Sequence, residues 1–93
     1  MKIDIEFEAQ LREVAGQQRM SVELPDGQTL SHAIQAATEE SEALRNRLLT
    51  PAGDLQPSVM VFINEQPVAA AASDAKTLNN GDTVLLLPPI SGG

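Results

Sequence analysis

Two continuous apolar stretches limit most strongly what this 93-residue chain can form. They are Val59–Ile63 and Val84–Leu87, and neither alternates polar with apolar side chains. Unbroken runs of this kind are typical of strands that are covered on both faces. Because the chain shows only one main apolar helical stripe, a sheet built from these strands has one face without a helix. We therefore predict an α+β fold in which the open face of a sheet carries apolar side chains.

The amino-terminal residues predict two strands separated by a helical turn. Residues 2–8 alternate between charged and apolar side chains, the pattern of a strand with one buried face. Residues 11–15 have the spacing of a short helical turn, which Gly16 ends. Residues 20–24 then predict the second strand, followed by turn chemistry at 25–27. The apolar side chains of the first strand are Ile3, Ile5 and Phe7.

The main helix is predicted to begin after Thr29. The Thr29 hydroxyl can accept a hydrogen bond from an amide of the first helical turn. Leu44 and Leu48 continue a helical spacing further on, so the helix either extends or restarts before residues 50–54 end it. The apolar stripe of the main helix is Leu30, Ala33, Ile34 and Ala37.

The second half of the chain predicts two more strands. Residues 58–64 form one of them, a turn is expected at 64–67, and the structure of 69–72 stays open. Residues 79–82, Asn-Asn-Gly-Asp, are a strong turn signal before the last strand, 83–87. Prolines 88 and 89 donate no amide hydrogen and therefore end that strand. We expect one domain over residues 1–87 and a flexible tail over 88–93.

The open face of the sheet is a predicted docking surface. Contiguous apolar surface on a soluble protein usually marks a partner site. Alternation along the strand allows two sets of exposed side chains, joined in either case by members of the last strand, Leu87 among them. A loop or a second copy of the chain covering these residues is the alternative. The two sets are Met60 with Phe62, and Val59 with Val61 and Ile63.

Composition narrows the classes of partner. Thirteen acidic and six basic residues give a formal charge of −7, which repels nucleic acid and anionic lipid and favours a basic protein partner. Acidity for solubility alone is the simpler alternative. Without cysteine the chain has no disulfide or thiolate chemistry. The amino terminus lacks the apolar stretch of a signal peptide, so a cytoplasmic protein is expected.

The tail Pro88-Pro89-Ile90-Ser91-Gly92-Gly93 is the most informative segment for function. The two prolines stiffen its start, and six extended residues reach at most about 20 Å. The final glycines carry no side chain that would obstruct a narrow channel. The tail is therefore predicted to enter a partner's active site, with the carboxylate of Gly93 as the working group.

The chain resembles the β-grasp sulfur carriers, which include the small subunit of molybdopterin synthase. The resemblance is carried by residues 80–84 and 87–93 at the end and by 7–16 at the start, and the main helix falls where that family has its helix. The length of 49–57 is closer to that of archaeal small modifier proteins. The family has a ubiquitin-like β-grasp fold, a mixed sheet with one main helix on one face and a free tail.

The resemblance implies a chemistry for Gly93. A ubiquitin-activating-type adenylyltransferase would use ATP and magnesium to form an acyl-adenylate, and a sulfur donor would convert it into a thiocarboxylate. Sulfur would then pass to an acceptor such as the molybdopterin synthase large subunit. Synthesis of cysteine or another thio-metabolite is one alternative, and a protein modifier joined to target lysines is another. A ubiquitin-like interaction module with an inert tail is a third possibility.

The sequence gives little support for catalysis by this chain itself. It has no glycine-rich phosphate loop, so the partner is expected to bind the nucleotide. His32 has Ser31 and Ser41 nearby in sequence, but a histidine on a helix surface is far more often solvated than catalytic. Residues 39–42 hold three glutamates without regular metal-ligand spacing, which favours a solvated acidic helix face over a cation site. We expect a carrier protein, without a metal, rather than an enzyme.

Overall fold

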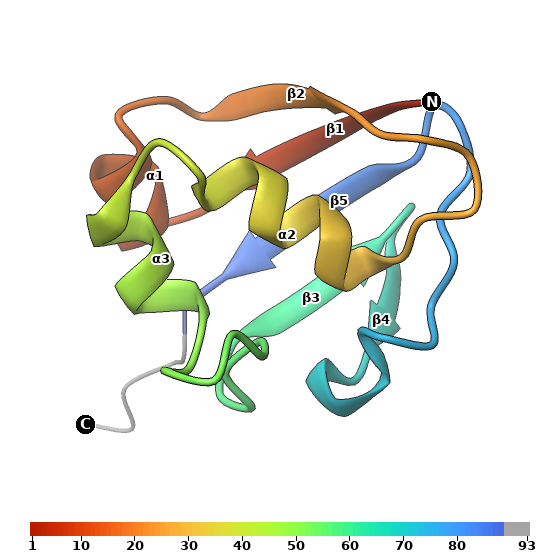
Figure 1. The fold of residues 1–93 in the computed structure, drawn as a ribbon. Helices are drawn as coiled ribbons and strands as arrows, with labels where there is room; N and C mark the ends of the chain where they lie inside the picture. The colour runs from red at the N-terminus through yellow and green to blue at the C-terminus, as the bar shows by residue number, and fades with distance from the viewer. Residues whose placement is uncertain (89–93) are drawn as a thin grey trace.

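The computed structural model describes residues 1–88, in which one mixed β-sheet carries its helices on one face (Figure 1). No helix in this part of the chain is long and apolar enough to cross a membrane. The elements in chain order are β1 (Lys2–Phe7), α1 (Gln10–Ala15), β2 (Arg19–Glu23), α2 (Leu30–Thr38), α3 (Glu42–Leu48), β3 (Met60–Ile63), β4 (Gln66–Val68), the 3₁₀ helix η1 (Ala70–Ala72) and β5 (Thr83–Leu87).

The strands lie in the order β2-β1-β5-β3-β4. The last strand, β5, is therefore the central one and lies between β1 and β3 (Figure 1). It pairs in parallel with β1 and antiparallel with β3, and the remaining neighbours are antiparallel. This arrangement confirms the predicted mixed sheet and places the first and last strands side by side.

Capping residues determine where the helices begin and end. Before α2, the backbone N–H of Thr29 donates to Nδ1 of His32, which confirms the predicted start of the main helix. The side chain of Ser41 accepts from the amide of Leu44, so α3 restarts as a separate helix instead of extending α2. Gly16 ends α1 with φ of 74°, a left-handed conformation that glycine adopts without strain.

The hydrophobic core lies between the sheet and α2. The first strand contributes Ile3, Ile5 and Phe7, all fully buried, as the alternation predicts. The predicted helix stripe is buried as well, which confirms the inward face of α2. The other large, fully buried side chains are Leu11, Leu44, Leu48, Val61, Leu78, Val84 and Leu86.

The turn predicted at 64–67 is shorter than expected. Asn64 and Glu65 alone form it, with φ of 49° and 71°, the positive values that a tight hairpin needs. Gln66 and Pro67 already belong to β4, which pairs with β3, so their assignment to the turn was wrong. Proline is compatible with this position because β4 is an edge strand. Residues 70–72, left open by the sequence, form η1.

A buried carboxylate ties the start of β5 to the end of β3. Asp82 is only 9% exposed, and its two oxygens accept from the side-chain amide of Asn64 and the backbone N–H of Asn79, both at 2.8 Å. The side-chain oxygen of Asn64 in turn accepts from the amide of Thr83. These contacts fix how far along β3 the last strand begins.

Replacement of Asp82 by alanine is expected to lower the free energy of unfolding by about 2–3 kcal/mol. The change leaves an amide hydrogen of Asn64 and that of Asn79 without their buried acceptor. Urea unfolding of Asp82→Ala measures the effect, and Asp54→Ala, which removes an exposed carboxylate in a loop, is the control. An equal, small loss in both variants would contradict a structural role for Asp82.

Candidate docking site

The open face of the sheet carries a group of apolar side chains. Strand registers place Met60 opposite Leu87, and Phe62 opposite both Leu85 on one side and Pro67 on the other. Side chains directly opposite one another in a sheet lie on the same face. Met60 is 41% exposed, and Phe62, Leu85 and Leu87 are half-buried. We call this group, Met60, Phe62, Pro67, Leu85 and Leu87, the apolar patch.

The structure decides between the two sets of residues that the sequence left open. Val59, Val61 and Ile63 are buried in the core, so Met60 and Phe62 are the set on the open face. The cause lies in the register with β5, where Val61 is opposite Leu86 and Ile63 is opposite Val84. Val84 and Leu86 are buried in the core. Their partners on β3 are therefore buried on the same face of the sheet.

Two members of the apolar patch, Leu85 and Pro67, were not named from the sequence. Leu85 could have been found from its spacing of two from Leu87, because both then lie on one face of the strand. Pro67 could not be found while residues 64–67 were read as a turn, since its place beside Phe62 depends on β4.

Charged side chains border the apolar patch on the β1 side. Glu6 lies opposite Leu85 and Asp4 opposite Thr83, so a row of carboxylates runs along the patch. Glu6 forms an ion pair with Arg19 of β2, and its hydrogen bond and charge raise the pKa of Arg19 above the ordinary value. Between this row and Phe62 lies a shallow hollow of about 650 Å³, lined by Glu6, Phe62, Asn64, Glu65, Thr83 and Leu85.

The chain leaves the sheet beside the apolar patch. The amide of Glu8 donates to the carbonyl of Leu86 at 3.1 Å, close to the end of β5, and Leu87 is both the last strand residue and a member of the patch. Pro88 follows, half-buried and outside the strand, as predicted. The remaining tail residues named from the sequence, Pro89, Ile90, Ser91, Gly92 and Gly93, lie outside the described residues.

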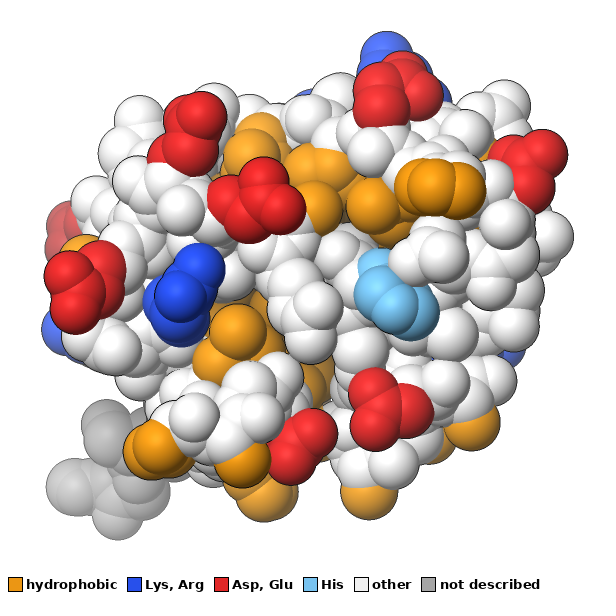
Figure 2. Space-filling view, in the orientation of Figure 1, with side chains coloured by type: hydrophobic (Ala, Val, Ile, Leu, Met, Phe, Trp, Pro, Cys, Tyr) orange, Lys and Arg blue, Asp and Glu red, His pale blue; other side chains and the backbone are white. Residues whose placement is uncertain are grey.

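The helix side of the molecule holds the other residues considered from the sequence. Figure 2 shows acidic side chains spread over this side around the histidine, His32. His32 is exposed and bound to Thr29, Ser31 donates to Asp74, and Ser41 caps α3, so these three form no joint site. Within residues 1–88, no group of three or more His, Cys, Asp or Glu side chains is placed to hold a metal ion.

The fold defines the class of protein. A mixed five-stranded sheet of this order, wrapped on one face around a main helix, is the ubiquitin-like β-grasp fold, which confirms the predicted fold class. Residues 5–93 match the ThiS family. The chain therefore belongs to the ThiS family of β-grasp proteins, which comprises small ubiquitin-like sulfur carriers and modifiers.

Individual relatives fall in the same group. The chain is 31% identical over 93 residues to small archaeal modifier protein 3 of Haloferax volcanii, covering all of both chains. The crystal structure of SAMP1 from the same organism superposes with a TM-score of 0.88 at 28% identity, again over all of both chains. A putative molybdopterin converting factor subunit 1 from Pyrococcus furiosus shares the fold at a TM-score of 0.76 and 22% identity, over 97% of this chain and 99% of that one.

Proposed function

We propose that this protein is a sulfur carrier whose working group is the carboxylate of Gly93. The observation that carries the proposal is the position of the apolar patch, which ends in Leu87, directly before the tail that leads to Gly93. A partner that covers the patch has the tail within reach, because the six residues from Pro88 extend at most about 20 Å. Docking and chemistry can therefore occur at two sites on one partner.

The surface favours a particular kind of partner. The apolar patch supplies the contact area, and the neighbouring carboxylate of Asp4 selects for basic side chains at the rim of the partner's surface. The formal charge of −7 adds a long-range attraction to a basic partner. An adenylyltransferase of the ubiquitin-activating type with an apolar docking surface and a basic rim meets these requirements.

The proposed chemistry needs nothing from this chain except its terminus. A carboxylate is a poor electrophile, so the activating enzyme uses ATP and magnesium to join the Gly93 carboxylate to AMP with release of pyrophosphate. A donor of sulfide-level sulfur then replaces AMP and leaves a thiocarboxylate. The thiocarboxylate sulfur is the nucleophile that a second partner receives, so this chain serves as carrier and co-substrate.

We propose molybdopterin synthesis as the first pathway to test, with the large subunit of molybdopterin synthase as acceptor. The tail, Leu87-Pro88-Pro89-Ile90-Ser91-Gly92-Gly93, supports this choice through its likeness to the molybdopterin synthase small subunit. Cysteine or another thio-metabolite is the alternative product. The same thiocarboxylate serves all of these pathways, and only the acceptor differs.

Protein modification is the second candidate function. It is supported by the relative at 31% identity, which is named a small archaeal modifier protein. In this function the activated Gly93 carbonyl is attacked by the amine of a target lysine, which forms an isopeptide bond and releases the activating group. The carrier and the modifier share the activation step and differ in the nucleophile that follows.

Intact mass spectrometry of the protein from its native host tests the proposal. We expect a species in which one terminal oxygen is replaced by sulfur, with the exchange located at Gly93 by fragmentation. Only an unmodified carboxylate, even after incubation with the cognate activating enzyme, ATP and a sulfur donor, would reject the carrier function. Lysine-linked adducts of higher mass would support the modifier function instead.

A further inference from the structure

Strand β2 is an edge of the sheet with free backbone hydrogen-bonding groups. On its inner side, Gln18 accepts from the amide of Phe7 and Leu24 donates to the carbonyl of Met1, each at 2.9 Å. Backbone groups of an antiparallel strand point alternately toward one neighbour and then away from it. The residues Arg19, Ser21 and Glu23 therefore direct their N–H and C=O groups away from β1, where residues 1–88 place no further strand.

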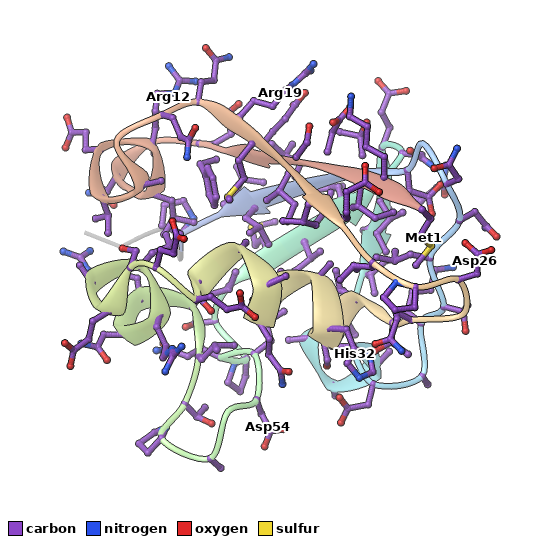
Figure 3. All side chains as sticks on the ribbon, turned by 45° about the horizontal axis from the view of Figure 1, so that its top comes forward. Met1, Arg12, Arg19, Asp26, His32 and Asp54 are labelled. Atoms are coloured by element: carbon purple, nitrogen blue, oxygen red, sulfur yellow. The ribbon has the colours of Figure 1, made fainter. Side chains whose placement is uncertain are left out.

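The two edges of the sheet differ in their readiness to pair. The β4 edge is three residues long and contains Pro67, which has no amide hydrogen, so it is blunted against strand addition. The β2 edge is five residues long, Arg-Met-Ser-Val-Glu, and has neither proline nor glycine. Figure 3 shows the Arg19 side chain extending from this side of the sheet, away from His32 on the helix side. The β2 edge is thus open to a further strand.

Polar side chains on the open face of β1 and β2 form a regular cross-strand pattern. Glu6 pairs with Arg19 in an ion pair, and the hydroxyl of Ser21 donates to Asp4 at 2.7 Å. At the other end of the strand, Lys2 lies opposite Glu23. The two ends of β2 therefore carry opposite charges on either side of a neutral centre at Ser21.

We propose that β2 pairs antiparallel with β2 of a second copy of this chain, with Ser21 opposite the partner's Ser21. This two-fold arrangement places Arg19 opposite the partner's Glu23, and Glu23 opposite the partner's Arg19. A row of alternating charges then crosses the seam from Glu6 through Arg19 to the partner's Glu23 and Lys2. On the inner face, Met20 meets the partner's Val22, which adds an apolar contact.

The centre at Ser21 follows from the charges and from the backbone. A two-fold axis at Arg19 or at Glu23 would set two like charges against each other, which is unfavourable in a cross-strand pair. An axis at Met20 or Val22 would leave Arg19 and Glu23 without their opposite partners. With the axis at Ser21, every outward N–H and C=O of the strand is bonded and both charge pairs form.

The proposed dimer leaves the apolar patch free. Antiparallel pairing continues the sheet, so the open faces of both copies lie on the same side. The seam lies at β2, whereas the patch lies on β5 and β3, on the far side of β1. A contact through one strand edge buries less surface than a stable dimer needs, and each copy carries a charge of −7, so we expect association at roughly millimolar concentration.

A concentration series of amide NMR spectra with sedimentation equilibrium tests the proposal on the full chain. For the natural protein we expect amide shifts that change with concentration and are centred on residues 19–23. Arg19→Glu and Glu23→Arg each set like charges across the seam, and each is expected to weaken self-association roughly tenfold or more. An equimolar mixture of the two variants restores opposite charges at both positions and is expected to recover the association.

Lys76→Glu is the matched control, because it makes the same charge change as Arg19→Glu at an exposed loop residue that contacts Leu30 at the start of α2. It is expected to leave the dimer intact, and melting curves check that every variant folds. Absence of association up to the millimolar range, or failure of the mixture to recover it, would overturn the proposal. Shifts centred on Met60, Phe62 and Leu87 would also overturn it and point to a dimer through the apolar patch.

Discussion

A chain with one alanine added after Gly93 is expected to lose activation by its adenylyltransferase almost completely, with a rate loss of at least about 100-fold. The added residue moves the carboxylate by about 3.5 Å, the length of one extended residue. A near-attack geometry tolerates displacements of about 1 Å poorly, so the carboxylate oxygen misses the α-phosphorus of ATP. Release of pyrophosphate on mixing enzyme, ATP and carrier measures the rate.

The control for this variant restores the natural end of the chain. A carrier made with a longer extension, which a site-specific protease removes back to Gly93, is expected to be activated at the natural rate. Binding of the extended chain to the enzyme is expected to persist, because the apolar patch is unchanged. Normal pyrophosphate release from the alanine-extended chain would contradict the requirement for a carboxylate at the position of Gly93.

Substitution of Phe62 or Leu85 by aspartate is expected to weaken binding to the activating enzyme by at least about 30-fold, equivalent to about 2 kcal/mol. Both side chains lie at the centre of the apolar patch, opposite each other across β3 and β5. A carboxylate there must lose its water when the partner's apolar surface covers it, which costs free energy for a charge at the centre of the contact. Calorimetric titration of the enzyme with each variant measures the affinity.

Ala43→Asp is the matched control for the patch variants. Ala43 is exposed on α3, on the helix side of the sheet, so the same new charge should leave the affinity within about twofold. Thermal melting checks that Phe62→Asp and Leu85→Asp remain folded, since both positions are half-buried. Unchanged affinity of folded patch variants would show that the partner binds elsewhere.

The sequence correctly predicted those parts of the fold in which a local pattern of side chains is compatible with only one structure. The alternation in residues 2–8 admits a single buried face, and Ile3, Ile5 and Phe7 indeed form it. The apolar stripe of α2 also allows a single buried face, and the helix begins directly after its N-cap residue, Thr29. In each case the residues that decide the structure are neighbours in the chain.

The outward face of β3 could not be predicted because both faces of that strand are apolar. The choice depends on pairing with β5, more than twenty residues away, which aligns Val61 with Leu86. The same kind of distant pairing makes Gln66 and Pro67 a strand, since only contact with β3 gives these residues a partner. The candidate site was therefore predicted in its location, and its exact membership required the register of the sheet.

The tail remains a prediction of the sequence, because Pro89–Gly93 lie outside the described residues. Its likeness to the sulfur carriers rests on residue types and their order. Pro88 is the last residue whose position the structure gives, and its place directly after Leu87 agrees with the expected end of the strand.

The central position of β5 bears on how the protein is synthesised. The strand that lies between β1 and β3 is the last of the described strands in chain order, so it leaves the ribosome after the others. While β5 is still inside the ribosome, the two halves of the sheet have nothing to join them, so folding waits for that strand. A chain cut short before β5 lacks the middle of its sheet and, with it, Leu85 and Leu87 of the apolar patch. The sheet therefore forms only in chains that have been translated at least through Leu87.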